Sequence, residues 1–576
     1  MSALAAAFIG FALGHTAPQE RPAAPIGADT VVAVVHVDVI PMDREGILRD
    51  HTVVVRGDRI VGMGPSPAVP VPAGSTVIDG SGHYLLPGLT DAHVHIEDLP
   101  WAHARPDFGD GPLYLAYGVT TVFSLSGTPL QLEWRRRVAA GELLGPTIYT
   151  AGAFVNEPRV SSPESVRDDI VRQAREGYDF IKYHEFPETT TGLSLRAYNT
   201  MIETAREVGL PLVGHAPVNL GLDALLQARQ PLAHVGMLTN IYFLPLLSHR
   251  MTLVVTAVAL GVLVLLLLVS IARHVARRWR KSDAGRSGQL ALTVFTVASA
   301  LVAFVAAAAS SPGGPRFDSM ALRLVFAVLA IGIVIAAVVS TTLTIGLWRN
   351  AAVAIASRIE AAVASCAIVA LAATLVTFWV PISWRSTDRG IAQLARRVHD
   401  AGIPVQTTLT VYETIDGPTR ALLLHDPAID YLRHDTAGAW RRLPADGPPG
   451  ARVHEFAIKV VGALHRAGVT LMAGTDAMGL PLVVPGASLH RELRLLIGSG
   501  LTPYEALRAA TVVPAAFAGK SMEFGTIAVG KRADLLLVAR NPLEDIASLQ
   551  EPLGVMTRGR WLTHERLSEL LEALKR

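Results

Sequence analysis

The chain has 576 residues, more than one hydrophobic core normally organises, so we expect more than one domain. Its 51 lysines and arginines nearly balance its 49 aspartates and glutamates, which gives no reason to expect a nucleic-acid partner. The single cysteine, Cys366, excludes an intramolecular disulfide and a cysteine-based zinc site, so any metal must be held by His, Asp, Glu or Lys.

Residues 1–28 are expected to be a leader and linker. Residues 1–25 contain a short apolar stretch followed by a Pro- and Ala-rich polar segment, which is typical of a signal peptide. No basic residue precedes the apolar stretch, so a degenerate or truncated membrane anchor fits the same residues. Both interpretations stay open.

Residues 29–83 and 522–576 have the same character although they lie far apart in the chain. Both contain short β-branched runs separated by turns, such as HTVVVRGDRIVGMG at residues 51–64. We expect them to pair into one small β-sandwich domain. The last stretch, residues 563–576, is predicted to be a docked helix, because four leucines share one of its faces. These are Leu567, Leu570, Leu571 and Leu574.

From Tyr84 onward, apolar strand-like runs alternate with amphipathic helical stretches. The helical stretches 163–177, 197–209 and 390–402 each end at a glycine, as helices commonly do. The strand-like runs are residues 84–95, 118–126, 147–155, 180–185, 210–217, 231–236, 405–411 and 469–477. Eight β-α units predict an α/β fold, a (β/α)8 TIM-like barrel, with strands 1–6 in residues 84–250 and strands 7–8 in residues 385–521.

Residues 251–384 interrupt this barrel with strongly apolar sequence. Four uncharged runs are each long enough, at about 1.5 Å per residue, to cross a hydrocarbon core of about 30 Å. They are residues 251–272, 290–309, 324–347 and 361–382. We predict an inserted four-helix transmembrane block, with the lipid bilayer as a partner of the chain. The runs also lack histidine, so anchoring is favoured over an ion or substrate pathway.

The loops between these runs predict the orientation of the block. The first loop, residues 273–289, is rich in arginine, whereas the second, residues 310–323, carries only Arg316 and Arg323. The positive-inside rule places the first loop in the cytoplasm, and an even number of crossings leaves both flanks on the opposite side. We therefore expect a multi-pass protein of the bacterial inner membrane, with its catalytic domain outside the cytoplasm.

Candidate metal ligands recur where the predicted barrel strands end. His93 and His95 are two residues apart, so their side chains share one face of a strand. The other candidates, at the ends of or within later strands, are Lys182, His215, His234 and Asp476. Each alone could be structural, as a salt-bridge partner, a core histidine or a helix N-cap. Together they fall on the face of a barrel where catalytic residues gather.

Several motifs resemble the amidohydrolase superfamily of metal-dependent hydrolases, in its imidazolonepropionase-like and Xaa-Pro-dipeptidase-like branch. They are PGLTDAHVH (87–95), AYGVTTV (116–122), DFIKYH (179–184), GHAP (214–217), AHVG (233–236), AGTDA (473–477), LHRELRLLIGSGLTPYEALRAAT (489–511) and GTIAVGKRADLLLV (525–538). Two features depart from the family pattern: GHAP replaces the commoner H-A-H, and the four-helix insertion is unusual. The first departure leaves the ligands in place. The second weakens any inference about substrate from relatives.

The resemblance implies a role for each candidate residue. His93, His95 and Asp476 would hold one divalent ion, His215 and His234 a second, and Lys182, carboxylated on its amine, would bridge them. Imidazole and carboxylate donors suit zinc or a similar first-row ion. Such ions would activate water and polarise a scissile carbonyl, while Asp476 would act as general base and then general acid. Some relatives use one ion without the lysine, and that alternative stays open.

The predicted activity is hydrolysis of a C–N bond in a small-molecule amide, cyclic amide or dipeptide-like substrate. The same site could hydrolyse an ester or lactone, and a ligand-binding membrane protein without catalysis is the alternative from another class. The membrane block falls between strand six and its helix, on the catalytic face of a barrel. The mouth of the barrel is therefore expected to face the membrane, which would favour an apolar substrate such as an N-acylated amide. A block that only tethers the enzyme, with no bearing on its substrate, is the alternative.

Five other residues have an ordinary structural explanation beside a possible role in the site. His490, early in the helix after strand eight, could touch substrate or hold a neighbouring residue. Tyr183 and His184 flank Lys182 and could line the pocket or pack in the core. His454 and His465 lie on one amphipathic helix and are expected to be solvated or packed.

Overall fold

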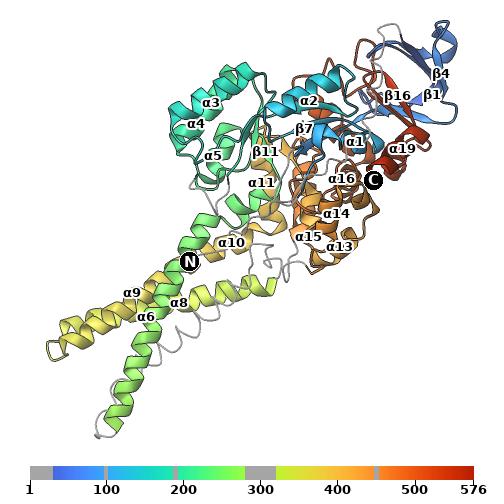
Figure 1. Cartoon of the computed structure of the whole chain (residues 1–576). Coiled ribbons are helices and arrows are strands. Elements are labelled where there is room, and N and C mark those ends of the chain that lie inside the picture. The colour runs from blue at the N-terminus through green and yellow to red at the C-terminus, as the bar shows by residue number, and fades with distance from the viewer. Residues whose placement is uncertain (1–29, 97–101, 186–191, 279–319, 447–452, 576) are drawn as a thin grey trace, which may run out of the picture.

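The computed structural model describes residues 30–96, 102–185, 192–278, 320–446 and 453–575. These residues form a central barrel, a small β-domain on one side of it, and an arm of long helices on the other (Figure 1). The predicted leader, residues 1–28, and the predicted apolar run 290–309 lie outside the described residues.

The barrel consists of eight parallel strands. One sheet holds three strands and the other holds five, in the order β13-β12-β11-β10-β9. A bridge between Ala151 and Phe180 joins the sheets on one side, and the Ala92 N–H donates to the Ala473 carbonyl on the other at 3.0 Å. The strands are β6 (Leu89–Val94), β7 (Val119–Ser124), β8 (Thr147–Thr150), β9 (Ile181–Tyr183), β10 (Leu212–Gly214), β11 (Leu232–Ala233), β12 (Val405–Gln406) and β13 (Leu471–Met472). The barrel is therefore closed, and the sequence-based prediction of eight strands is confirmed.

A helix follows each strand and covers the outside of the barrel. The helices are α1 (Gly111–Ala116), α2 (Pro129–Ala139), α3 (Pro163–Glu176), α4 (Leu195–Glu207), α5 (Gly221–Ala228), α11 (Asp388–Asp400), α15 (Val453–Arg466) and α16 (Ala487–Gly498). Helix α3 shows why these segments are helical. The Ser162 side chain caps its first turn, Val166 and Ile170 bury its apolar face, and Gly177 ends it at φ 88°. The three helices predicted from glycine-terminated sequence are all present.

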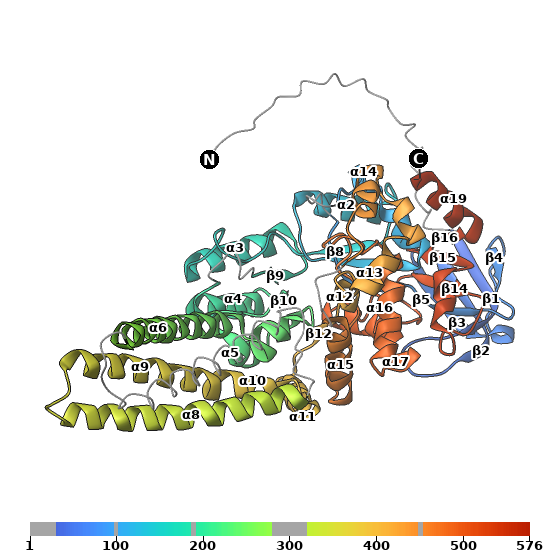
Figure 2. The same cartoon turned by 90° about the horizontal axis from the view of Figure 1, so that it is seen from below.

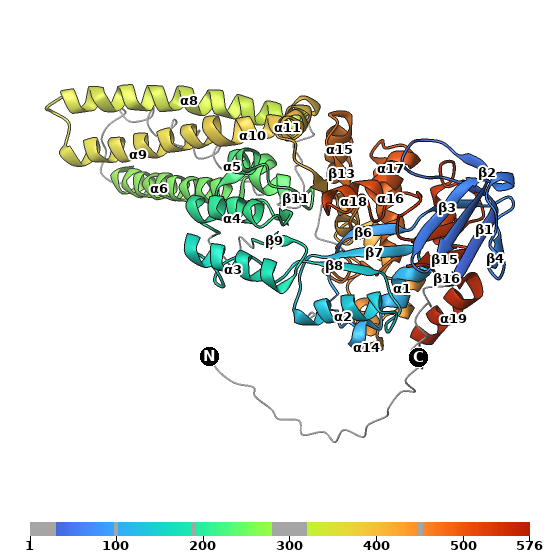
Figure 3. The same cartoon turned by 90° about the horizontal axis from the view of Figure 1, so that it is seen from above.

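The small β-domain combines strands from both ends of the described chain. Its sheet runs in the order β16-β15-β14-β5-β1-β2-β3, with β4 paired to β1. Leu85 of β5 lies opposite Leu537 of β14, and both are buried. The strands are β1 (Val31–Val39), β2 (Leu48–Arg56), β3 (Arg59–Pro65), β4 (Thr76–Asp79), β5 (Tyr84–Pro87), β14 (Leu535–Val538), β15 (Gly554–Thr557) and β16 (Arg560–Thr563). Figure 3 shows this sheet beside the barrel strands β6 to β8.

The run predicted as one barrel strand from Tyr84 is divided at Gly88. Strand β5 pairs in the β-domain, and β6 begins the barrel at Leu89. A Cβ atom at residue 88 would lie 2.2 Å from Thr120 Oγ1, so only glycine allows the chain to pass this close to β7. The apolar sequence is continuous across the division, and this is why the sequence alone did not show it.

Shorter elements complete the fold. The C-terminal helix α19 buries Leu567 and Leu570. Its Leu571 and Leu574 pack against an apolar cluster that includes Trp440, so the helix is docked on the protein as predicted. The remaining elements outside the arm are η1 (Ser66–Ala68), η2 (Pro106–Phe108), α12 (Leu409–Glu413), α13 (Gly417–Leu423), η6 (Pro427–Tyr431), α14 (His434–Arg441), α17 (Pro503–Ala509), α18 (Val512–Phe517), η7 (Ile546–Gln550) and α19 (His564–Leu574).

The helical arm lies between β11 and α11 in the chain, where the sequence predicted the insertion. It contains α6 (Leu246–Arg278), α8 (Met320–Arg349), α9 (Ile355–Thr374) and α10 (Val380–Arg385), and two short π-helices, η3 (Thr239–Phe243) and η5 (Leu375–Trp379). Helices α6, α8 and α9 run alongside one another and share a small apolar core that includes Leu263, Ile333 and Ile368 (Figure 2).

The outward faces of the arm are strongly apolar. Leu265 and Val338 are more than 60% exposed. Three stretches of the described residues, Met251–Val269, Ala327–Arg349 and Ile355–Ile382, are long and apolar enough to cross a membrane. Exposed apolar surface of this extent requires a covering phase or partner. The length and composition of these helices are those of segments that could span a membrane.

Candidate metal centre

The six residues singled out from the sequence converge at the carboxyl ends of the barrel strands. His93 belongs to β6 and Lys182 to β9, and the other four follow the ends of strands. All except His234 are buried, and His234 is half-buried. The residues are His93, His95, Lys182, His215, His234 and Asp476.

Unusual backbone conformations position two of these side chains. His234 and Asp476 have φ values of 65° and 64°, in the left-handed region that residues with a side chain rarely adopt. Thr408, which follows β12, has φ 45° and contacts His234. Such strain persists only where surrounding contacts impose it, and it clusters at functional sites.

Asp476 lies at the centre of the group. Its Oδ1 is 3.0 Å from His95 Nε2 and 3.4 Å from His93 Nε2. His93, His234 and Asp476 each offer one ligand atom, and these three atoms lie within 4.8 Å of one another. Lys182 Nζ is 3.2 Å from His93 Nε2. One divalent ion could therefore contact His93, His234 and Asp476 together.

The histidines form a row of imidazole rings across the mouth of the barrel. Ring centroids are separated by 5.6 Å between His95 and His93, and by 4.5 Å between His93 and His234. The row continues from His234 to His215 at 5.0 Å and from His215 to His184 at 3.9 Å. His184 also stacks on Phe154 at 4.2 Å. His184, whose role the sequence left open, therefore lies at the end of the row.

Hydrogen bonds at Nδ1 orient three of these rings. His215 Nδ1 donates to the Glu185 carbonyl at 3.1 Å, because a carbonyl can only accept. Gln406 Nε2 donates to the Ala92 carbonyl at 2.7 Å, so its Oε1 accepts from His93 Nδ1 at 3.0 Å. His234 Nδ1 contacts Thr408 Oγ1 at 2.9 Å. With the proton on Nδ1, each Nε2 keeps the lone pair that metal binding requires.

The electrostatics of the cluster suit a cation. Burial lowers the pKa of His93 and His215 well below the usual value and that of His234 to about 4, so these imidazoles are neutral at pH 7. Burial opposes ionisation of Asp476, but His234 and His95 outweigh it and lower the pKa of the carboxyl to about 2. Neutral imidazoles around one carboxylate are a donor set that fits zinc or a similar ion.

Two buried carboxyl groups accept hydrogen bonds from segments close to the candidate ligands. Asp91 accepts from the Thr475 N–H at 2.9 Å and the Thr475 hydroxyl at 2.6 Å, and thereby ties β6 to the segment that carries Asp476. Glu492 of α16 accepts from the Thr410 N–H at 2.9 Å. Burial raises the pKa of both carboxyls to about 7. Asp91 could have been noticed in the sequence as a polar residue inside an apolar strand.

Three of the remaining sequence candidates, His490, Tyr183 and His465, have structural contacts. His490 Nε2 donates to the Tyr117 carbonyl at 2.8 Å and so braces the chain before β7. The Tyr183 hydroxyl donates to Glu185 Oε2 at 2.5 Å. His454 and His465 lie on α15, and His465 Nε2 is 3.6 Å from Glu505.

Replacing Gln406 with leucine is expected to weaken metal binding by about 10- to 100-fold, the usual cost of losing a group that orients a metal-binding histidine. Leucine keeps most of the volume but cannot accept from His93 Nδ1. Competition with a chelator of known affinity would measure the effect. Gln227→Leu, on the exposed face of α5, is the matched control. Equal affinities in the two variants would contradict the assigned role of Gln406.

Part of the sequence is similar to known proteins. Residues 449–562 match the model of the amidohydrolase family. An adenine deaminase of Rubrobacter xylanophilus is 30% identical over 175 residues, 28% of this chain and 28% of that protein. An ochratoxinase of Aspergillus niger is 34% identical over 119 residues, 20% of this chain and 22% of that protein. The chain thus matches only about a quarter of the length of these relatives.

Solved structures are similar over nearly the whole chain. A bottromycin amidohydrolase has a TM-score of 0.56 at 19% identity and covers 94% of this chain, which covers 90% of it. A Xaa-Pro dipeptidase with bound methionine has a TM-score of 0.52 at 14% identity, with 93% of this chain and 100% of that one covered. At these identities the likeness shows the fold, a barrel with an attached β-domain.

Proposed function

We propose that this chain is a metal-dependent hydrolase of the amidohydrolase superfamily that cleaves a C–N bond in an amide, cyclic amide or dipeptide-like substrate. The convergence of His93, His95, His215 and His234 with Lys182 and Asp476 on the catalytic face of the barrel carries the proposal. The family match over residues 449–562 supports it. The barrel-wide structural likeness agrees.

The proposed ligands divide into two groups. His93 and His95 with Asp476 would hold one ion, since both Nε2 atoms lie within 3.4 Å of Asp476 Oδ1. His215 and His234 would hold the second. Lys182 is fully buried beside His93, where a bare ammonium would be costly. Carboxylation would turn it into an anionic oxygen donor between the two groups.

In the proposed mechanism Asp476 moves the proton. A bound divalent ion would lower the pKa of water and polarise the scissile carbonyl. Asp476, ionised and next to His93 and His95, would accept the proton of the attacking water through a carboxylate oxygen. It would then donate that proton to the leaving nitrogen, as general base and then general acid. Gln406 and the Glu185 carbonyl would keep the imidazole rings in position.

Activity screening of the detergent-solubilised chain tests this function. We expect turnover of members of an amide and dipeptide library, loss of that turnover with a chelator, and recovery when zinc is added back. A parallel ester and lactone library addresses the other reaction that such a site could catalyse. Turnover of esters alone would replace the proposed C–N specificity, and amide turnover that resists metal removal would contradict the metal dependence.

We also propose that the arm anchors the enzyme in a membrane. The two ends of the arm meet at the barrel, where Arg385 Nη1 donates to the Tyr242 carbonyl at 2.7 Å and the guanidinium lies 5.0 Å from the Tyr242 ring centroid. The arm leaves from the loop after β11, so the mouth of the barrel would lie near the bilayer surface. Substrates with an apolar N-acyl chain would suit this position, and assays in lipid nanodiscs with acyl chains of different length would test it.

The proposed orientation predicts a labelling pattern in bacterial spheroplasts. In a Cys366→Ser background, a membrane-impermeant maleimide should label Glu133→Cys, on the exposed face of α2, but not Ser282→Cys. The barrel would then lie outside the cytoplasm and the arginine-rich loop inside. Labelling of Ser282→Cys with protection of Glu133→Cys would reverse the topology.

A further inference from the structure

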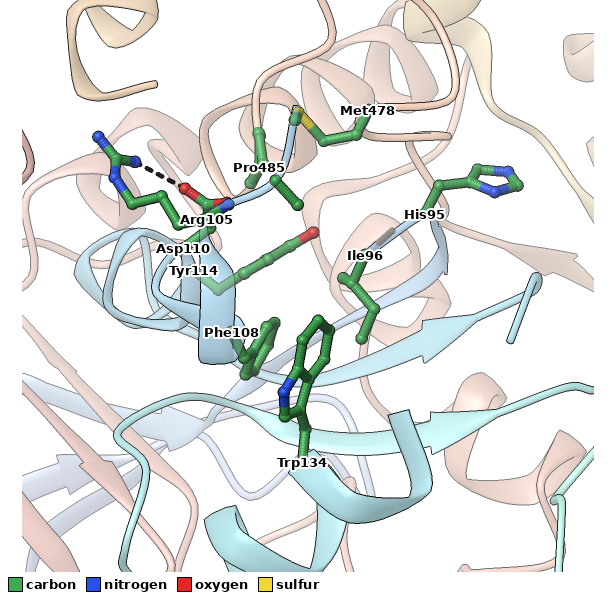
Figure 4. A pocket seen from close by; sticks show the side chains of 10 residues that line it. His95, Ile96, Arg105, Phe108, Asp110, Tyr114, Trp134, Met478 and Pro485 are labelled. Carbon is green, nitrogen blue, oxygen red and sulfur yellow. Dashed lines mark hydrogen bonds and ion pairs between the residues drawn. The ribbon is translucent and has the colours of Figure 1, made fainter. Parts of the chain in front are cut away.

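A small pocket lies directly beside the metal centre. It is formed by His95 and Ile96 directly after β6, the segment 104–110 leading into α1, Trp134 of α2, and the loop after β13. His95 forms one edge of this pocket, and its Nε2 faces Asp476 on the other side at 3.0 Å. In Figure 4 the His95 ring points away from the pocket, so the pocket and the metal ligands share only this residue. A substrate held at the metal centre could extend past His95 into it.

Most of the pocket wall is apolar. Ile96, Met478 and Pro485 line one part, and the Phe108 and Trp134 rings stack at a centroid distance of 5.7 Å in another. The charged residues of the lining neutralise each other, because Arg105 Nη1 donates to Asp110 Oδ1 at 2.6 Å. A charged substituent would therefore find no free partner among the described lining residues. The pocket suits an uncharged group.

The Tyr114 hydroxyl and the Trp134 Nε1–H are two polar groups of the pocket lining without a hydrogen-bond partner among the described residues. Tyr114 is 1% exposed, and its hydroxyl has no hydrogen-bond partner within the described part of the chain. In Figure 4 this hydroxyl points toward the middle of the pocket, between Pro485 and Ile96. Buried hydroxyls are nearly always paired, because an unpaired one loses its hydrogen bond to water without replacement. This donor is therefore placed for a ligand.

We propose that this pocket binds an uncharged, mainly apolar substituent of the substrate that carries one hydrogen-bond acceptor, and that the Tyr114 hydroxyl donates to that acceptor. The proposal rests on the proposed hydrolase function and adds the chemistry of one substrate group. An ether or carbonyl oxygen within a short alkyl substituent meets the requirement. Tyr114 is thus a specificity-determining residue that does not itself act on the scissile bond.

Matched substrate pairs in which an ether oxygen replaces a methylene group test this assignment. Methoxyacetyl and butyryl amides form one pair, and ethoxyacetyl and pentanoyl amides form another. The wild-type chain should prefer the ether member by about tenfold in kcat/KM, the usual size of one added hydrogen bond to a buried donor. Tyr114→Phe should abolish this preference and leave kcat/KM for the methylene member unchanged. Tyr178→Phe, outside the pocket lining, is the control and should keep the preference.

Two further measurements separate this proposal from the hydrolase function. Dissociation constants of the same amide pairs, measured on chelator-treated protein, should show the same ether preference without turnover. The Tm of Tyr114→Phe should equal or exceed that of the wild type, because the variant removes an unpaired hydroxyl. An equal loss for both members of each pair, a lower Tm or unchanged binding in Tyr114→Phe would overturn the proposal. Failure of turnover with the binding preference intact would instead count against the hydrolase function.

Discussion

Asp476→Asn is expected to fold normally and to lose turnover by about 10²- to 10⁴-fold, the range that a general acid and base contributes. Asparagine has nearly the same size and keeps one side-chain oxygen beside His95, so the packing of the segment after β13 should survive. It cannot accept the proton of an attacking water at pH 7. The substitution also removes the negative charge that lies beside His93 and His95.

Circular dichroism and kcat on one amide substrate would measure this effect. Asp400→Asn, at the exposed end of α11, makes the same chemical change away from the site and should leave kcat unaltered. A kcat for Asp476→Asn close to that of the wild type would refute the role of Asp476 in proton transfer.

The second large effect is expected for His234→Ala. His234 lies at the middle of the row, with its ring between those of His93 and His215. Its removal should disturb both proposed ligand groups at once. Loss of a residue that hydrogen-bonds to a metal ligand lowers metal affinity or activity by about 10- to 100-fold. Loss of the ligand itself should therefore lower kcat by more than about 100-fold.

The control for this variant is His454→Ala on α15, outside the row of imidazoles. Both variants remove one imidazole, and only the loss at His234 should abolish activity and release metal. Added zinc would restore part of the activity of His234→Ala if the remaining ligands still bind an ion weakly. Full activity of His234→Ala without added metal would contradict its place in the centre.

The sequence predicted the barrel and the convergence of its strand ends because both depend on local patterns. Apolar runs of strand length, glycines at helix ends and polar residues directly after the runs are visible in short windows of sequence. In a parallel barrel the ends of all strands lie on one face, so local positions become a shared site. His93, Lys182 and His215 could be proposed together for this reason.

The residues that hold the ligands in place could not be found in the same way. Gln406 contacts His93 across 313 positions of sequence, and Thr475 contacts Asp91 across 384. No local pattern records such pairs, because closure of the barrel brings them together. The division at Gly88 was hidden for a similar reason, since it depends on the approach of Thr120 from the next strand. These features depend on contacts between residues far apart in the chain, and for this reason the sequence alone could not predict them.

The metal content of the purified wild-type chain tests the central claim most directly. Mass spectrometry of the detergent-solubilised protein should find close to two divalent ions per chain, about the number that a binuclear hydrolase site holds. This content should fall sharply in His215→Ala and His234→Ala. A content near one that survives Lys182→Ala would replace the binuclear site by a mononuclear one. Absence of bound metal from a fully active preparation would contradict the account.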